Sequence, residues 1–174
     1  MLKKLISSAA CILGLLCSSA SAQETSNRVS TQTDWSVFVE SDPTECWAVT
    51  APKETVNKRD GIVVAVRRSK ILLFVFHRPS DNVKGQVAFT GGYPFAKGRS
   101  IALDLDGVTY DLAADGEWAW PPSAADDAKI ITAMKRGAKA VVTAQSERGT
   151  VTKDTFSLIG FTAAVKDAEK RCAG

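Results

Sequence analysis

The residues of this chain that could do chemistry are few and lie far apart in the sequence. His77 is the single histidine, so any Ser-His-Asp triad or histidine-based metal site would have to use it. It follows an apolar, strand-like run and has no Cys or His at ligand spacing. We therefore expect a structural histidine, and we assign no catalytic residue, no metal site and no cofactor from the sequence.

Three aspartates, Asp104, Asp106 and Asp111, cluster around an Asp-Gly pair. Carboxylates at alternate positions of a strand share one face, as the carboxylate pair of a glycosidase or a calcium site requires. Turn chemistry and a solvated sheet face explain the same residues. The cluster leaves one enzymatic alternative open, an envelope hydrolase that acts on glycan.

The first 22 residues have the pattern of a Sec-type secretory signal peptide. Lys3 and Lys4 precede a short apolar stretch at residues 6–16, and Ala-Ser-Ala at 20–22 forms a cleavage site. The apolar stretch is too short for a stable membrane span. We expect an exported protein, cut before Gln23, in the periplasm, at the outer surface or secreted, with no transmembrane segment in the mature chain.

Cleavage there would remove two of the four cysteines and leave Cys46 and Cys172. In an oxidising compartment an even pair is most simply one disulfide, and the alternative is two unpaired buried thiols. Cys172 shares one face of a predicted C-terminal helix with several apolar residues. The bridge is therefore expected to attach that helix to the first strands of the domain.

The charge of the chain argues against a nucleic-acid partner. Lys and Arg number 22 and Asp and Glu number 19, a net charge of +3, and loss of Lys3 and Lys4 with the signal would lower it by two. A nearly neutral chain lacks the excess of basic residues that binds phosphate backbones. The basic clusters at residues 58–59 and 67–70 are expected in solvated loops, with contact to an anionic lipid or glycan as the alternative.

Strand patterns dominate the chain after a polar leader at residues 23–33, which we expect to be flexible. The Asp-Gly pair at 106–107 lies between two alternating runs and predicts a β-hairpin. Residues 62–66 and 71–76 are β-branched and aromatic, and they predict a second hairpin around the basic turn 67–70.

Two helices interrupt the strands. Ser123 is predicted to cap the first helix and Gly137 to end it, and residues 161–172 have the apolar spacing of a second helix. Residues 34–174 are therefore expected to form one mainly β domain, with one inserted helix and a C-terminal helix. Its architecture is an antiparallel β-sandwich or a partly closed barrel, because the strand spacing fits both.

Six short motifs occur in order along this domain: CWAV (46–49), GYPF (92–95), WAW (118–120), AMKRG (133–137), RGT (148–150) and DTFSLIGFTAA (154–164). The series resembles that of the invasion-associated locus B family. The resemblance runs from about residue 46 to residue 172. It implies an exported, mostly β protein of the cell envelope, in a family named for a role in host-cell entry. It implies no established catalytic residues.

The favoured functional class is a non-enzymatic protein that binds an unknown envelope or host macromolecule. Its candidate interaction surface combines aromatic and basic side chains near predicted loop ends: Tyr93, Phe95, Trp118, Trp120 and Arg148. Trp118 and Trp120 share one face of their strand because side chains alternate along it. The runner-up is the glycan hydrolase, which depends on the three aspartates.

Overall fold

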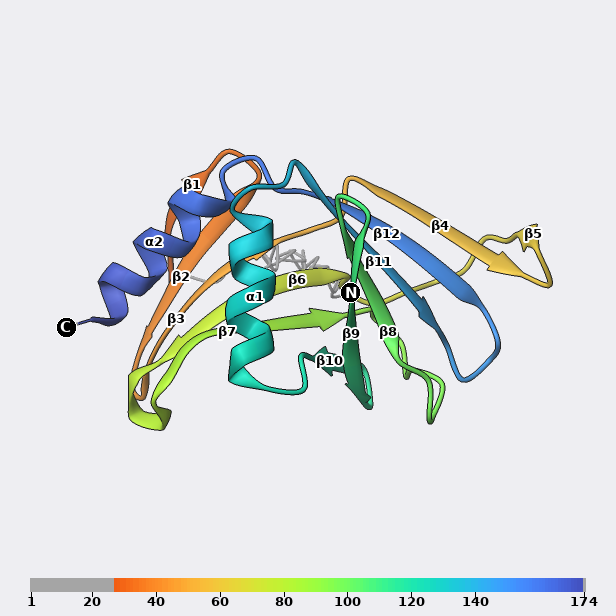
Figure 1. Ribbon diagram of the computed structural model, residues 1–174, viewed down its shortest axis with the longest axis horizontal. Coiled ribbons are helices and arrows are strands. Elements are labelled where there is room, and N and C mark those ends of the chain that lie inside the picture. The colour runs from red at the N-terminus through yellow and green to blue at the C-terminus, as the bar shows by residue number, and fades with distance from the viewer. Residues whose placement is uncertain (1–26, 174) are drawn as a thin grey trace, which may run out of the picture.

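The computed structural model describes residues 27–173 (Figure 1). The predicted signal peptide at 1–22 and the first part of the predicted leader lie outside the described residues. The helices are α1 (Ala124–Met134), α2 (Phe161–Cys172) and a short 3-10 helix, Pro79–Asp81. The strands are β1 Arg28–Gln32, β2 Trp35–Ser41, β3 Thr44–Thr50, β4 Glu54–Arg59, β5 Ile62–Val63, β6 Leu72–Arg78, β7 Val83–Thr90, β8 Ile101–Leu105, β9 Val108–Asp115, β10 Trp118–Trp120, β11 Lys139–Gln145 and β12 Val151–Ser157.

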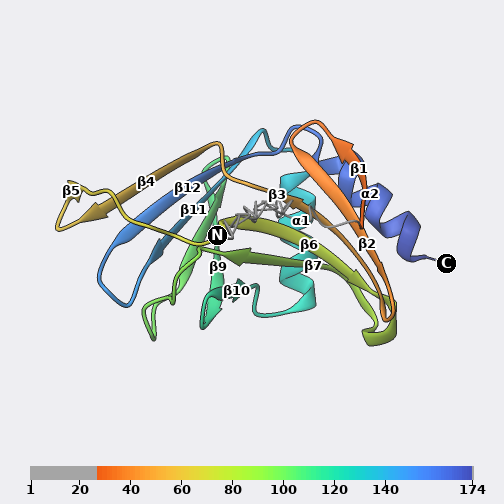
Figure 2. The same cartoon turned by 180° about the vertical axis from the view of Figure 1, so that it is seen from behind.

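All twelve strands belong to one antiparallel sheet with the order β1-β2-β3-β6-β7-β10-β9-β8-β11-β12-β4-β5. The predicted fold class, a mainly β domain with one inserted and one C-terminal helix, is confirmed. The sheet is continuous and does not close into a barrel, because β1 and β5 are its two ends and do not pair with each other. It bends into an arch, with β1, β2 and β3 on one side and β4, β11 and β12 on the other (Figures 1 and 2).

One face of the arch holds the main core and both helices. α1 packs on β7, and α2 packs on β2, β3 and β6 (Figure 1). Apolar faces of helices and sheet are thereby buried against each other, as a single-core domain requires. The fully buried large side chains come from both sides of the arch and both helices, and include Trp35, Leu73, Phe89, Leu103, Ile130, Phe156 and Phe161.

The turn between β8 and β9 and the N-terminal cap of α1 form where the sequence predicts them. Asp106 and Gly107 connect β8 to β9, and both adopt positive φ angles, of 51° and 89°. Ser123 caps α1, since its Oγ accepts a hydrogen bond of 3.2 Å from the Asp126 N–H. These elements depend on neighbours in sequence, which explains why they could be predicted.

The predicted flexible leader differs from the structure. Arg28–Gln32 form the ordered strand β1, which pairs with β2. Its side chains are exposed or half-buried, so this edge strand has no buried apolar face to reveal it in the sequence. Backbone pairing holds it, together with a hydrogen bond of 2.5 Å from Ser30 Oγ to Asp167 Oδ2 on α2. The ordered domain therefore begins before residue 34.

The hairpin predicted from residues 62–66 and 71–76 is also wrong. β5 (Ile62–Val63) pairs instead with β4 across Asp60 and Gly61, a second Asp-Gly turn. β6 begins at Leu72 and pairs with β3 and β7, so residues 64–71 form a connection with no strand of their own. Residues 58–59, expected in a loop, lie in β4.

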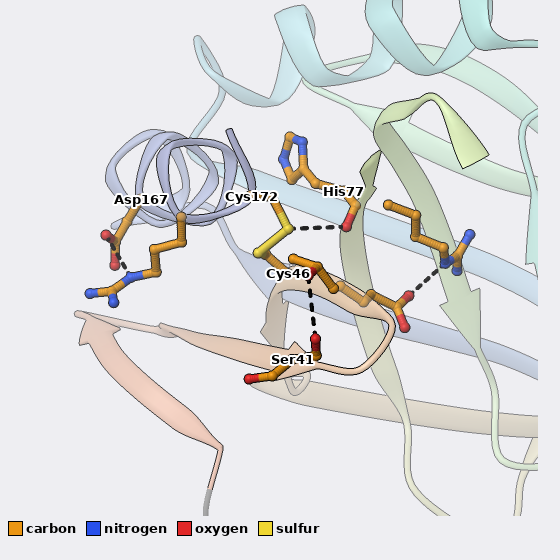
Figure 3. The surroundings of a disulfide bond; sticks show 9 residues. Ser41, Cys46, His77, Asp167 and Cys172 are labelled. Atoms are coloured by element: carbon orange, nitrogen blue, oxygen red, sulfur yellow. Dashed lines mark hydrogen bonds and ion pairs between the residues drawn. A yellow bond between two sulfur atoms is a disulfide. The ribbon is translucent and has the colours of Figure 1, made fainter. Parts of the chain in front are cut away.

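Helix α2 is fixed at both ends. At its start, Gly160 has a φ of +91°, and a Cβ there would lie 1.9 Å from the carbonyl oxygen of Gln32, so glycine allows the close approach to β1. At its end, Cys172 forms the predicted disulfide with Cys46 on β3 (Figure 3). The bridge spans a sequence separation of 126 residues, so it joins the two ends of the domain.

Candidate functional site

The structure divides the five residues of the predicted interaction surface between two locations, and the Tyr93 and Phe95 rings lie together in one of them, with centroids 5.2 Å apart. Trp118 and Trp120 lie on the outer face of the sheet, opposite the main core. Phe95 is only 4% exposed and belongs to the core, so it cannot contact a partner. Tyr93 and Arg148 line a separate pocket beside β12. The predicted surface is therefore not one patch.

Trp118 and Trp120 belong to a larger surface, here called the aromatic face, which consists of Phe38, Trp47, Phe74, Phe76, Trp118 and Trp120. A chain of ring contacts crosses the sheet. The ring centroids of Phe38 and Trp47 are 5.5 Å apart, and those of Trp47 and Phe76 are 6.3 Å apart. Trp120 continues the chain at 6.4 Å from Phe76. Such distances are within the range of favourable aromatic pairs.

Alternation along β6 creates the centre of the aromatic face. Leu73 and Val75 point into the main core, so Phe74 and Phe76 point to the opposite face. Trp47 on β3 is the register partner of Phe76, and Phe38 on β2 is the register partner of Trp47. Direct cross-strand pairing therefore aligns three of the rings in one row.

A small residue on β7 joins the two tryptophans to this row. Ala88 is the register partner of Phe74 and contributes only a methyl group to the outer face. Trp118 therefore reaches Phe74 at 5.5 Å across β7, and Trp120 reaches Phe76. Ala88 is fully buried beneath these rings. This arrangement depends on the order β6-β7-β10, which no local sequence pattern indicates.

The aromatic face is partly open to solvent and has a polar rim. Trp118 is 37% exposed, and Trp47 and Trp120 are half-buried. At the rim, the Arg78 guanidinium lies 4.8 Å from the Phe76 ring centroid. The same guanidinium forms an ion pair with Glu45, so its charge is balanced beside the rings.

In the part of the chain that the structure describes, the aromatic face lacks the helical cover that the other face of the sheet has. Its apolar cluster consists of strand residues alone, whereas the buried apolar residues of α1 and α2 all belong to the main core. Within residues 27–173, neither helix contributes to this cluster. An exposed apolar patch with a polar rim is typical of an interaction site, and tryptophan is enriched where such sites bind most strongly.

Tyr93 and Arg148 belong to the second location. The Tyr93 hydroxyl forms a short hydrogen bond with Thr152 Oγ1, and the Arg68 guanidinium lies 5.0 Å from its ring centroid. Burial raises the pKa of Tyr93, against the opposing effects of the Thr152 hydrogen bond and the Arg68 charge. Tyr93 is therefore a neutral phenol at physiological pH. Arg148 is exposed in the turn between β11 and β12.

The three aspartates of the hydrolase hypothesis have different surroundings. Asp104 Oδ1 accepts a hydrogen bond of 3.3 Å from the Gly107 N–H, which is turn chemistry. The Asp106 carboxylate lies beside Gly137, just after α1. Asp111 instead lines a surface pocket. Within residues 27–173, these three carboxylates do not form a group placed to hold a metal ion.

His77 and the cysteines have structural roles. His77 is 6% exposed, and burial lowers the pKa of its imidazole, against the opposing charge of Glu169. It is therefore neutral at physiological pH, and its Nε2 has no hydrogen-bond partner among residues 27–173. Figure 3 shows it beside the disulfide, where Cys172 Sγ lies 3.5 Å from its carbonyl oxygen. The disulfide removes Cys46 and Cys172 as nucleophiles.

The described residues contain neither a metal-binding cluster nor a helix that could span a membrane. In this part of the chain, no group of three or more His, Cys, Asp or Glu side chains is placed to hold a metal ion. None of the helices between residues 27 and 173 has the length and apolar character needed to cross a membrane.

Comparison with known proteins identifies one family. The model of the invasion associated locus B (IalB) protein family matches residues 35–169. No curated protein and no solved structure matches the chain. The family match starts at Trp35 on β2 and ends within α2, so it spans the core and both helices. The chain belongs to the invasion-associated locus B family.

Proposed function

We propose that this chain is an exported, non-enzymatic binding protein of the cell envelope, which contacts an envelope or host macromolecule through the aromatic face. The observation that carries the proposal is the row of six rings on the face of the sheet opposite both helices. Trp118 is 37% exposed and Trp47 and Trp120 are half-buried, so apolar ring surface remains open to solvent on a face that neither helix covers within residues 27–173. The signal-peptide pattern and the family's link to invasion support a partner outside the cytoplasm.

The exposure of the tryptophans fits binding by burial of apolar surface. Trp118 is the most exposed ring of the aromatic face, and Phe74 and Phe76 are 8% and 9% exposed beneath it. Covering a half-exposed tryptophan stabilises a complex because large apolar rings leave water. The Arg78–Glu45 pair at the rim offers polar contacts that orient a partner.

The hydrolase alternative has weaker support. It required the carboxylates of Asp104, Asp106 and Asp111 to meet in a cleft, as glycosidase chemistry does. Each of the three has a different neighbour: the Gly107 N–H, the Gly137 backbone and a separate pocket. We therefore retain the binding function.

Site-specific photocrosslinking in intact cells tests the proposal. p-Benzoylphenylalanine at position 118 reports on the aromatic face, and the same group at Val108, a 56% exposed residue that begins β9, is the matched control. We expect a discrete crosslinked species from position 118 that is absent from position 108. Mass spectrometry of that species would identify the partner.

A second set of variants tests whether the aromatic rings themselves contact the partner. With the crosslinker at Glu45 on the rim, Trp118→Ser is expected to remove most of the adduct, because it deletes the most exposed ring. Lys153→Ser, a surface change on β12, is expected to leave it intact. Equal adducts at positions 118 and 108, or no effect of Trp118→Ser, would refute the aromatic face as the binding surface.

A further inference from the structure

A pocket of about 530 Å³ lies beside β12 and shares no residue with the aromatic face. Most of its lining comes from the connection between β5 and β6, the residues after β7, and the turn between β11 and β12, and single residues are added by β4, β12 and the turn between β9 and β10. We call it the arginine pocket because Arg59, Arg67, Arg68 and Arg148 line it. The volume is in the range of small-molecule sites.

The base of the arginine pocket is built around a buried ion pair. Arg68 donates from Nη1 and Nη2 to the two carboxylate oxygens of Asp154, at 2.7 and 2.6 Å, with side chains 5% and 0% exposed. Its Nε donates to the Gly91 carbonyl at 2.8 Å. Asp154 therefore balances the charge of Arg68, which fixes the base without supplying a free cation to the pocket.

Buried hydroxyl groups complete the base. Thr152 is 1% exposed and bonds to the Tyr93 hydroxyl, and Thr150 is 4% exposed and accepts from Arg59 Nη2 at 2.8 Å. Ser146, 9% exposed, accepts from the Thr150 N–H. A hydroxyl both donates and accepts, so the hydroxyls of Thr150 and Ser146, which act as acceptors in these bonds, can donate to a ligand oxygen.

The wall formed by residues 64–71 is held in place by close backbone contact. The Ser69 N–H donates to the Gly92 carbonyl at 3.0 Å. Gly92 has a φ of +72°, and a Cβ there would lie 2.7 Å from the Ser69 carbonyl oxygen. Only glycine allows the two segments to approach this closely, so the pocket is preformed.

The rim carries three arginines, Arg59, Arg67 and Arg148, and two acids, Glu117 and Glu147. All five are exposed. Within residues 27–173, the Arg67 and Arg148 side chains have no hydrogen bond or ion pair, so their guanidinium donors are available to a ligand. Guanidinium groups match the two oxygens of a carboxylate or phosphate, which gives short, charge-assisted hydrogen bonds.

We propose that the arginine pocket binds an oxyanion, the carboxylate or phosphate group of a small ligand. Arg67 and Arg148 hold the anionic group at the rim, and the hydroxyls of Thr150 and Tyr93 face the rest of the ligand. Glu117 and Glu147 oppose the entry of a second negative charge. They therefore favour a ligand with a single anionic group. This site is independent of the macromolecular binding proposed for the aromatic face.

Anion titrations followed by NMR test this proposal on the disulfide-bonded protein. Methyl phosphate and acetate are added separately at constant ionic strength, and ¹H–¹⁵N spectra are recorded. We expect saturable shifts of the amides of Gly92, Ser146 and Thr150 with at least one of the two anions. Comparison of the two anions shows which oxyanion the site prefers.

Variants distinguish binding in the arginine pocket from a general attraction of anions to the charged surface. Arg67→Ala and Arg148→Ala are each expected to weaken binding roughly tenfold, as loss of a charge-assisted hydrogen bond does. Arg136→Ala removes an exposed arginine after α1 and is the matched control. Both pocket residues are exposed, so the variants should fold, which well-dispersed spectra would show. Linear shifts with no saturation for both anions, or equal weakening by Arg136→Ala, would overturn the proposal.

Discussion

Arg68 and Asp154 form a two-pronged ion pair that is almost completely removed from solvent. Both guanidinium Nη atoms bond to the carboxylate, and the side chains are 5% and 0% exposed. Arg68 comes from a connection without secondary structure, and Asp154 comes from the middle of β12. The pair therefore attaches residues 64–71 to the sheet, which makes one wall of the arginine pocket rigid.

Arg68→Leu is expected to lower the free energy of unfolding by about 3–5 kcal/mol, because it leaves the Asp154 carboxylate buried without a partner. The double variant Arg68→Leu/Asp154→Leu is expected to be more stable than the single variant, since it removes both charges. Urea denaturation monitored by tryptophan fluorescence measures both effects. If the double variant were less stable than Arg68→Leu alone, the interpretation of this pair would be wrong.

The Cys46–Cys172 disulfide gives a second prediction. Replacing both cysteines by alanine is expected to lower the free energy of unfolding by about 3–5 kcal/mol, because the bridge closes a loop of more than 100 residues in the unfolded chain. Hydrogen exchange should increase first in the last turn of α2, where the bridge attaches. Unchanged protection of that turn would show that packing of Phe161 and Val165 alone holds the helix.

Sequence patterns predicted the elements whose signals are local. Ser123 and the residues around it specify a helix start within one turn, and Asp106-Gly107 specifies a hairpin within ten residues. Cys172 could be placed on the inner face of α2 because helical spacing is regular. Each of these signals depends on residues that are close in sequence.

Features that depend on distant pairing could not be predicted in the same way. β12 pairs with β4, so Thr152 is opposite Asn57, nearly one hundred residues earlier in the chain. The aromatic face likewise requires β3 beside β6 and β10 beside β7. Alternation identified Trp118 and Trp120 as a pair on one face, but only the strand order brings Phe76 and Trp47 to the same surface.

Asp127 provides a third prediction, at the contact between α1 and β7. Its Oδ1 accepts a hydrogen bond of 2.8 Å from the Val87 N–H in a buried position. Asp127→Ala is expected to lower the free energy of unfolding by about 1–3 kcal/mol, the cost of a buried donor without an acceptor. Asp127→Asn should cost less, because it keeps an acceptor and burial already raises the pKa of Asp127, disfavouring its charged form. Equal losses for the two variants, in urea denaturation, would contradict this role.

His77 gives the last prediction, on the pH dependence of stability. Burial lowers the pKa of its imidazole in the folded protein below the ordinary value of 6.5, and Lys135 adds to this effect whereas Glu169 opposes it. Below pH 6.5 the unfolded chain therefore binds a proton more readily than the folded protein does. By linkage, the contribution of His77 to the free energy of unfolding decreases as the pH falls from 6.5 toward the folded-state pKa.

His77→Gln removes this titration and keeps a polar side chain, so the comparison of the two proteins isolates it. The difference in unfolding free energy between wild type and variant should be constant above pH 7. Below about pH 6.5 the wild type should lose stability relative to the variant as the pH falls. Asp34, Asp126 and Asp167, whose pKa values are lowered from 3.8, titrate in a more acidic range and are common to both proteins. Urea denaturation at half-unit pH intervals measures the difference. A difference that stays constant from pH 7 to 5 would show that His77 binds protons equally in the folded and unfolded states, contrary to its burial beside α2.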